Sequence, residues 1–474
     1  MPHKAVTAAA AFALRALGYN AHRQFQRQLQ NPAEAQNRLL ETVIRDISQT
    51  DYGRAQGIHA QHGYDAFAAQ LPLQDYDSFQ PWIKRQLAGE PAITPHKVRH
   101  VEPTSGSSCA VKHIPYTRPL LNSFSRMFRI WAYDLLSAEY KPDTGRIFMS
   151  LSHANGDGFN DERDYLGTPL RQLLSPFLVL PKSRDMPAIA KTLAAEHDLE
   201  VISVWSPSYL LELLAQMPDM DWRAAWSKLK LISCWDSAQA APLADELRVL
   251  FPDVIVQGKG LLATEAPLTV PLAQGCAPLL GDVFFEFEMP DGTIKRLHEL
   301  KTGERGNLVI TQRGGLTRYR MGDTVQAGEF IHGTPSLTFL GRSAVCDIAG
   351  EKLNGVFVRE ALQTLLPNSA FTLVPVKRGY VLLTEQPVPD LAEDAEGALC
   401  AAYHYGVARR LGQLSAVQVV AVPQLVARLR AFHTSRGMKS GDIKDCALMT
   451  DATIAASLLR FLDETQPLVQ RSAA

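Results

Sequence analysis

Residues 104–117 read TSGSSCAVKHIPYT, and their first nine positions form a loop rich in small hydroxyl residues. Serine, threonine and glycine expose main-chain N–H groups on a chain flexible enough to wrap an anion. No Gly-Lys-Ser/Thr follows at Walker A spacing, so this is not a P-loop. An ordinary Ser/Gly turn before a helix is the plainer alternative. The composition predicts a triphosphate-binding segment made of Thr104, Ser105, Gly106, Ser107, Ser108 and Lys112.

Further along the chain, a carboxylate stands beside a hydroxyl in Ala263-Thr264-Glu265. This segment leaves an expected strand at 254–256. Carboxylate and hydroxyl oxygens suit Mg²⁺, which also binds phosphate oxygens. The pattern predicts that Glu265 holds Mg²⁺ beside a nucleotide, with a solvated loop glutamate as the alternative.

A third segment, Tyr319-Arg320-Met321-Gly322-Asp323, predicts a tight turn between strands. The Asp323 carboxylate can accept hydrogen bonds from both hydroxyls of a ribose. An Asx-type turn residue is the alternative interpretation. Gly341-Arg342 follows closely and adds a cation to the same part of the chain.

Bulk composition limits the classes of partner. The chain has 474 residues and a net charge of −1, so it lacks the basic surplus that nucleic-acid binding or an electrostatic membrane anchor needs. Its six cysteines show no CxxC spacing, which suits reduced thiols in a cytoplasmic enzyme. Arg15 interrupts the apolar run after Lys4, and no run approaches the ~20 apolar residues of a membrane span. We expect a cytoplasmic protein.

The order of predicted elements indicates an α/β fold. Residues up to about 90 are expected to be helical, and a helix is expected over 119–136. Short apolar strands at 146–152, 231–233, 254–256, 283–285 and 308–310 alternate with helices, which favours a largely parallel sheet. The pattern changes between Arg342 and Gly350. Beyond it, strands at 371–374 and 380–383, an acidic loop at 387–396 and helices at 398–411 and 453–463 predict a compact α+β module.

Taken in order, these motifs resemble the adenylate-forming enzymes, and within them the auxin-responsive-promoter family of acyl-acid amido synthetases. The resemblance implies a large N-terminal domain, residues 1–342, with βαβ-type sheets and a small β-barrel-like subdomain. It also implies a mobile α+β C-terminal domain, residues 343–474. The implied reaction activates a carboxylic acid with ATP and Mg²⁺ as an acyl-adenylate and transfers the acyl group to an amine, expected to be an amino acid.

The resemblance also assigns roles to single residues. Lys112 matches the family's loop lysine, and Arg342 the arginine near the domain hinge that contacts ribose or phosphate. Lys444, in Gly441-Asp442-Ile443-Lys444, resembles the C-terminal lysine that enters for adenylation, with Lys439 as its rival. A mobile ammonium can bridge the attacking carboxylate and the α-phosphate.

Three positions depart from the family pattern, and the acid pocket stays open. Cys109 and Ala266 stand where glycine is usual, and Leu261 stands where many relatives stack an aromatic ring on adenine. Aromatic residues at 124–131 and 205–209 are candidates for pocket or core. Either Arg126 or Arg129 could grip the carboxylate of the acid.

Three other functions compete. An acyl-CoA ligase would share the first step. His153-Ala154-Asn155-Gly156-Asp157-Gly158 spells HxxxDG, which resembles acyltransferases whose histidine is a general base. A non-catalytic nucleotide-binding relative is the third possibility, favoured by the three departures. It is opposed by the joint presence of Lys112, Glu265, Asp323, Arg342 and a C-terminal lysine.

Overall fold

The fold is that of a computed structural model of the chain. It describes residues 4–104, 112–137, 140–150, 168–181, 183, 185–342, 345–349, 351–367, 369–438 and 443–465. The rest of the predicted phosphate loop (105–111) and the HxxxDG segment (153–158) lie outside these ranges, as do Lys439 and the domain boundary at 343–344.

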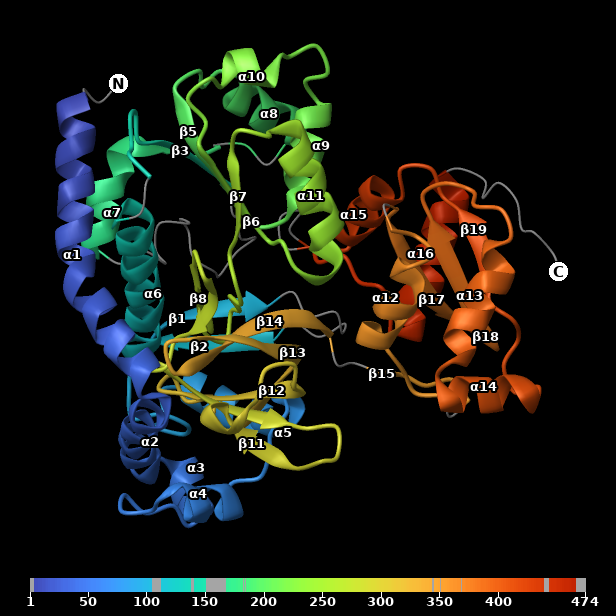
Figure 1. Ribbon diagram of the computed structural model, residues 1–474. Helices are drawn as coiled ribbons and strands as arrows, with labels where there is room; N and C mark the ends of the chain where they lie inside the picture. The colour runs from blue at the N-terminus through green and yellow to red at the C-terminus, as the bar shows by residue number, and fades with distance from the viewer. Residues whose placement is uncertain are drawn as a thin grey trace.

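Helices form the N-terminal part, as the apolar spacing predicts. The two longest, α1 (Lys4–Gln30) and α6 (Arg118–Ser137), lie side by side (Figure 1). Their contact is close at Gly18, where an added Cβ would lie 2.6 Å from the carbonyl oxygen of Arg129. The shorter helices are α2 (Pro32–Ser48), α3 (Asp51–Ala55), α4 (Tyr64–Gln70) and α5 (Tyr76–Leu87).

A β-hairpin carries the predicted phosphate loop. Strands β1 (Val98–Thr104) and β2 (Lys112–Thr117) are antiparallel, and Thr104 is the register partner of Lys112. The loop therefore begins and ends at neighbouring points of one hairpin. Helix α6 follows β2 directly, which confirms the helix expected over 119–136.

A parallel five-stranded sheet confirms the α/β prediction. Its strand order is β4-β3-β5-β6-β7, with helices on its connections (Figure 1). All six residues of β5 are buried, as expected for a central parallel strand. The strands are β3 (Arg146–Ser150), β4 (Leu178–Val179), β5 (Leu199–Val204), β6 (Leu231–Cys234) and β7 (Ile255–Gly258). The helices are α7 (Thr168–Leu174), α8 (Met186–Ala194), α9 (Pro207–Ala215), α10 (Trp222–Ala225) and α11 (Ala241–Leu250).

A second five-stranded sheet is antiparallel, in the order β11-β10-β12-β13-β14. Its strands are β10 (Val283–Glu288), β11 (Ile294–Arg296), β12 (Arg305–Gln312), β13 (Tyr319–Ile331) and β14 (Thr334–Arg342). The pair β8 (Thr269–Leu272) and β9 (Gly275–Pro278) lies against it, since β9 contacts β14. The strands expected at 283–285 and 308–310 exist but belong here, outside the parallel sheet.

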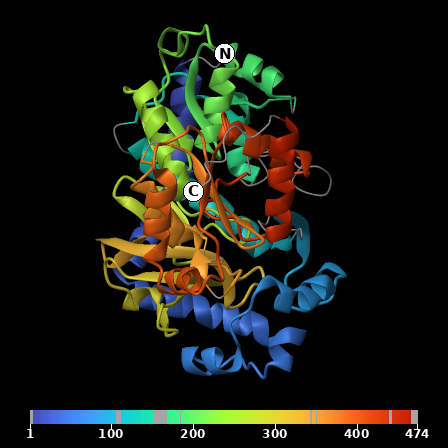
Figure 2. The ribbon, with the colours of Figure 1, turned by 90° about the vertical axis from the view of Figure 1, so that its right-hand side faces the viewer.

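The C-terminal part stands apart from the rest of the chain in the ribbon view (Figure 1), and Figure 2 shows it from its outer side. Its central sheet has the order β17-β18-β19. Its elements are β15 (Val345–Cys346), β16 (Leu353–Asn354), α12 (Gly355–Gln363), β17 (Phe371–Val376), β18 (Gly379–Thr384), α13 (Leu391–Cys400), α14 (Tyr403–Arg410), β19 (Gln418–Ala421), α15 (Leu425–Ser435) and α16 (Ala452–Thr465).

Two predictions in the C-terminal part were wrong in detail. The loop expected over 387–396 gives way to α13 from Leu391, and the single helix expected over 398–411 is divided between α13 and α14. The buried apolar clusters on the two sides of residue 343 share no residue. The boundary at 342/343 itself stays a prediction.

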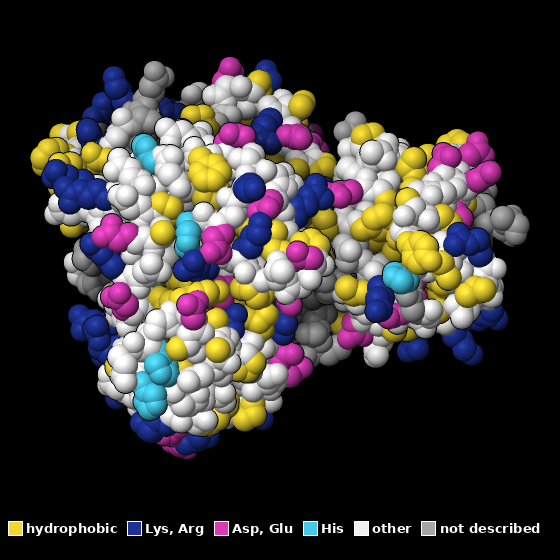
Figure 3. Space-filling view, turned by 60° about the horizontal axis from the view of Figure 1, so that its bottom comes forward, with side chains coloured by type: hydrophobic (Ala, Val, Ile, Leu, Met, Phe, Trp, Pro, Cys, Tyr) yellow, Lys and Arg dark blue, Asp and Glu magenta, His cyan; other side chains and the backbone are white. Residues whose placement is uncertain are grey.

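The surface agrees with the near-zero net charge. Acidic and basic side chains are interspersed on the face seen in Figure 3. Among the described helices, none combines the length and hydropathy needed to cross a membrane.

Candidate active site

Tyr319 is the residue around which the predicted site segments meet. It begins β13 and is fully buried, and the Lys112 ammonium donates a hydrogen bond to its hydroxyl at 3.5 Å. Lys112 also lies 5.6 Å from the ring centre of Tyr76. Burial first, and then the Glu265 carboxylate, raise the pKa of Tyr319. Lys112 and Glu265, far apart in the sequence, therefore approach the same side chain.

Asp323 and Arg342 form an ion pair beside Tyr319. They are register partners on β13 and β14, and Arg342 Nη1 lies 3.1 Å from Asp323 Oδ1. The Asp323 carboxylate is the main cause of a raised pKa for Arg342, and Glu265 and Tyr319 act in the same direction. The structure thus brings Lys112, Glu265, Asp323 and Arg342 into one electrostatic neighbourhood.

The segment expected to be a tight turn at 319–323 is instead part of a strand. Its pairing with β12 shifts register between Asn307 and Val309, so extra residues of β13 bulge outward. Gly322 lies in this bulge with φ of +73°, a conformation that favours glycine. The bulge ends at Asp323, which begins the regular pairing with β14.

Thr264 and Glu265 occupy the tip of a tight turn after β7. The amide of Ala263 donates to the carbonyl of Ala266 at 3.1 Å, which closes the turn. Tyr116 holds the turn from the hairpin side, since its hydroxyl donates to the Thr264 carbonyl at 2.7 Å. Within the described ranges, the Glu265 carboxylate makes no hydrogen bond or ion pair, so its oxygens are available for a ligand.

The C-terminal segment 443–449 connects the C-terminal part of the chain to this neighbourhood. Lys444 Nζ lies 5.4 Å from the ring centre of Trp235. The Ser208 hydroxyl, on α9, donates to the Asp445 carboxylate at 3.3 Å. Cys446 is close enough to Arg342 to affect its pKa. On its other side, the segment is bonded to β17, because the Met449 amide donates to the Leu373 carbonyl at 2.9 Å.

A cavity of about 150 Å³ lies between helices α1 and α6 and the parallel sheet. Met127, Phe128 and Trp131 of α6 line it, so these aromatic and apolar residues belong to a pocket, whereas Phe124 and Tyr209 lie in the core. Trp205 also lines the cavity. It stacks on Trp235, with 5.9 Å between ring centres, so Lys444 lies one ring away from the pocket.

Arg126 and Arg129 are not among the residues that line this cavity. Arg126 Nε lies 3.6 Å from a carboxylate oxygen of the buried Asp282. Burial and the neighbouring Arg126 lower the pKa of Arg129. Neither arginine is placed to grip an acid in the pocket.

Lys259 is a pocket residue that the sequence did not reveal. Its ammonium donates hydrogen bonds to Ser203 Oγ at 2.8 Å and Ser233 Oγ at 3.2 Å, at the ends of β5 and β6. It also lies 5.4 Å from the ring centre of Trp205. The only available signal was a lysine six positions before Glu265, at the carboxyl end of a predicted strand, where parallel sheets bind ligands.

Comparison with known families places the chain. The GH3 family N-terminal domain matches residues 21–220, and the GH3 family central domain matches residues 277–342. Together these matches cover more than half of the chain. The chain belongs to the GH3 family.

Solved structures share the fold of this GH3 chain. An acyl acid amido synthetase, AtGH3.15, in complex with 2,4-DB superposes with a TM-score of 0.80 at 18% identity, over 96% of each chain. A 2-hydroxyisobutyryl-CoA ligase in the postadenylation state, in complex with 2-HIB-AMP, gives a TM-score of 0.58 at 15% identity, over 91% of each chain. No curated protein sequence matches the GH3 chain.

The three residues that depart from the family pattern, Cys109, Leu261 and Ala266, lie in different surroundings. Cys109 lies outside the described residues. Leu261 is buried, and its amide donates to Thr269 Oγ1 at 2.7 Å. Ala266 is fully buried, and its methyl group packs in the hydrophobic core.

Proposed function

We propose that this GH3 chain is an ATP-dependent acyl-acid amido synthetase. The observation that carries the proposal is the meeting of Lys112, Glu265, Asp323 and Arg342 around Tyr319. A partly buried set of two cations and two carboxylates next to an apolar cavity suits a reaction between a nucleotide and an organic acid.

Each element of the cluster has a role in this reaction. The loop of Thr104, Ser105, Gly106, Ser107 and Ser108, with Lys112, holds the triphosphate. Asp323 accepts hydrogen bonds from the ribose hydroxyls, and Arg342, which is paired with that carboxylate, contacts ribose or phosphate. Ala263 and Thr264 hold the turn that presents Glu265.

Glu265 is the residue that would hold Mg²⁺. The described residues contain no group of three or more His, Cys, Asp or Glu side chains that could bind a metal alone. A single carboxylate with available oxygens therefore fits a metal that takes its remaining ligands from phosphate and water. When bound, Mg²⁺ would neutralise charge on the phosphates.

The two chemical steps follow from this arrangement. A carboxylate oxygen of the acid attacks the α-phosphorus, the bond to pyrophosphate breaks, and an acyl-adenylate forms. The amine nitrogen then attacks the acyl carbon, the bond to AMP breaks, and the amine loses a proton. Lys444 stabilises the first step by bridging carboxylate and α-phosphate. The C-terminal domain, from residue 343, then rotates to withdraw Lys444 and admit the amine, which we take to be an amino acid.

Acid-dependent exchange between ATP and pyrophosphate tests the first step. We expect exchange with some members of a panel of alkyl and aryl carboxylic acids, lost in Asp323→Ala and retained in His153→Ala. Loss only in His153→Ala, without dependence on ATP, would favour the HxxxDG acyltransferase. ATP binding without exchange for any acid would favour the non-catalytic relative.

The acceptor decides between the two ligase classes. AMP release and a new amide mass in the presence of an amino-acid panel are expected for the amido synthetase. A thioester formed only when CoA is supplied would identify an acyl-CoA ligase instead. Use of ATP and the free thiols of the five described cysteines support a cytoplasmic location.

A further inference from the structure

Lys112, Glu265, Asp323 and Arg342 form the proposed nucleotide site, which we call the nucleotide cluster. The cavity beside it is elongated along the strands of the parallel sheet. Val201 and Ser203 of β5 both line it, as do Leu231 and Ser233 of β6. Residues two apart on a strand point to the same face and are separated by about 7 Å. The cavity therefore follows the sheet face from the middle of β5 and the start of β6 to the carboxyl ends of both strands.

One end of the cavity lies next to the nucleotide cluster; we call it the Lys259 end. Lys259, Ser203 and Ser233 bring a positive charge and two hydroxyls to it. Leu262 also lines the cavity, three residues before Glu265. A carboxylate at this end would lie on the side from which the nucleotide approaches.

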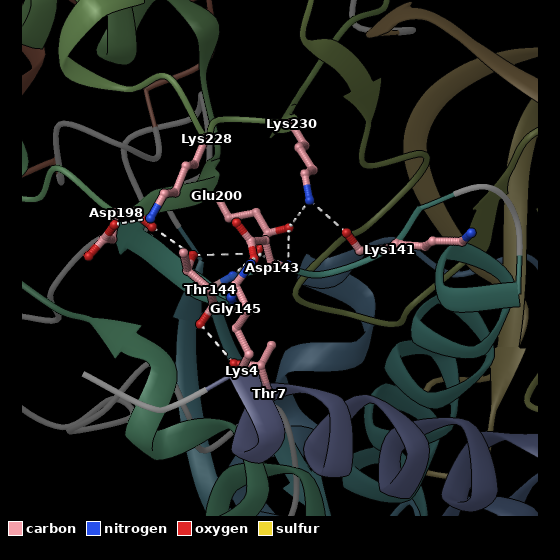
Figure 4. Close-up of polar contacts among 10 residues, drawn as sticks. All are labelled: Lys4, Thr7, Lys141, Asp143, Thr144, Gly145, Asp198, Glu200, Lys228 and Lys230. Carbon is pink, nitrogen blue, oxygen red and sulfur yellow. Dashed lines mark hydrogen bonds and ion pairs between the residues drawn. The ribbon is translucent and has the colours of Figure 1, made fainter.

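The opposite end is apolar because its polar groups are already bonded to one another; we call it the Gly145 end. Thr7 lines it, but its hydroxyl donates to the Thr144 carbonyl at 3.2 Å. Tyr140 lines it too, and its hydroxyl is bonded to Glu200, which contributes with burial to raising the pKa of Tyr140. Figure 4 shows Thr7 pointing from α1 toward this turn.

Glu200 fixes the wall of the Gly145 end. Its carboxylate accepts hydrogen bonds from the amides of Asp143 at 2.9 Å, Thr144 at 3.0 Å and Gly145 at 2.7 Å (Figure 4). Lys230 pairs with the same carboxylate at 2.8 Å. With these groups mutually satisfied, a polar substituent brought to this end would find no partner among them and would lose its hydration.

From these observations we propose that the acid substrate carries an unbranched aliphatic chain, with its carboxylate at the Lys259 end and its methyl terminus at the Gly145 end. This inference rests on the proposed function for its reaction, but concerns which acid is bound. Apolar side chains form the walls, aliphatic ones such as Leu14 and Met127 beside the rings of Phe128, Trp131 and Phe177, so length and apolarity select the acid.

Saturated straight-chain acids of increasing length, from butanoate to hexadecanoate, test the proposal in the pyrophosphate-exchange assay. We expect kcat/KM to rise about fourfold per added methylene, the factor that corresponds to about 0.8 kcal/mol, until the cavity is full. Octanedioate, which carries a second carboxylate at the Gly145 end, should react at least about tenfold more slowly than octanoate. Faster exchange with benzoate or phenylacetate, without a chain-length trend, would overturn the proposal.

A pair of variants on α1 locates the site. Ala11 lines the cavity one helical turn after Thr7, whereas Ala13 on the same helix does not line it. We expect Ala11→Leu to shift the optimum to shorter acids and to raise KM about tenfold for the longest wild-type substrate. Ala13→Leu should leave the length profile unchanged. An identical chain-length profile in both variants would show that the aliphatic chain of the substrate binds elsewhere.

Direct binding separates this inference from the proposed function. Displacement of a fluorescent fatty acid by the same acid series needs no ATP. Chain-length-dependent displacement without exchange would retain the aliphatic site and reject the ligase. Exchange with short aryl acids, together with no displacement, would retain the ligase and reject the aliphatic site.

Discussion

Two of the networks that bury charge in the described residues are built differently. The Glu200 network, defined by Glu200, Lys230 and the amides of 143–145, lies within one sheet and the turn beside it. The Arg430 network joins separate segments: Arg430 of α15 pairs with Glu212 of α9 at 2.9 Å and donates to Ser208, which donates to Asp445.

The two networks differ in which groups supply the hydrogen bonds. Main-chain amides hold Glu200 in a geometry that the turn itself fixes, so the network forms a permanent wall. In the Arg430 network every partner is a side chain, and the partners come from three segments: Arg430 from α15, Ser208 and Glu212 from α9, and Asp445 from the segment 443–449. Burial there raises the pKa of both Glu212 and Asp445, with Arg430 opposing the rise. Such a junction holds only while all its partners stay together.

The largest expected effect concerns Lys444, the neighbour of Asp445 in the Arg430 network. Lys444→Ala should lower acid-dependent pyrophosphate exchange by about 100-fold or more, because the charge between carboxylate and α-phosphate is lost. Thermal unfolding should be unaffected, since Lys444 is exposed. Lys377→Ala, in the turn between β17 and β18, is the matched control and should retain full exchange. If Lys444→Ala kept the wild-type exchange rate and Lys439→Ala lost it, Lys439 would be the lysine that acts in adenylation.

Removing the Glu200 carboxylate should lower the stability of the fold. Glu200→Ala leaves Lys230 and three amides without their acceptor, so we expect the free energy of unfolding to fall by about 3 kcal/mol. Asp198→Ala removes a neighbouring, more exposed pair with Lys228 and should cost at most about 1 kcal/mol. Urea denaturation compares the two, and equal midpoints would show that the wall is not anchored by Glu200.

Breaking the junction should reduce catalysis more than stability. Arg430→Met leaves Glu212 and Asp445 buried without their cation, so the C-terminal part should separate from α9. We expect about a tenfold lower exchange rate and a larger radius of gyration by small-angle scattering. Arg428→Met, on the same helix but bonded to Leu462 within the C-terminal part, is the control. An unchanged radius with unchanged exchange would reject the junction.

The smallest expected effect is a dependence on pH. Because burial raises the pKa of Glu212 and Asp445, the docked state binds protons more tightly than the separated state. Raising the pH through these pKa values therefore favours separation, and lowering it favours docking. Fluorescence energy transfer between labels on α9 and α15 should fall with rising pH, more steeply in Arg430→Met. A rise with pH would contradict this sign.

The sequence predicted the fold well where one strong local pattern decided each element. Continuous apolar runs gave β3, β6 and β7, and helical spacing gave α2 and α6. Gly322 misled the prediction at 319–323, because a glycine with positive φ serves a bulge as well as a turn. Pro387 and the acidic residues after it suggested a loop, but tertiary packing of Leu391, Ala395 and Leu399 makes a helix there.

The candidate site was predicted less completely, for a physical reason. Lys112, Glu265, Asp323 and Arg342 were found through the family resemblance, and their nucleotide roles stay predictions. Lys259 and Glu200 were missed because their partners are strand ends and main-chain amides distant in sequence. A single charged residue inside an apolar stretch carries no local sign of the partners that bury it.

The segment 444–446 has a mechanical consequence for the proposed rotation. Its three consecutive side chains lie near the Trp235 ring, the Ser208 hydroxyl and the Arg342 guanidinium, all in the N-terminal part of the chain. Residues 447–449 are instead bonded to β17. In the proposed rotation, a rigid movement of this segment would disengage all three side chains together. In the proposed reaction the lysine would therefore leave together with its two neighbours, and the change from the adenylation step to the amide-forming step would be switch-like, without a half-released stage.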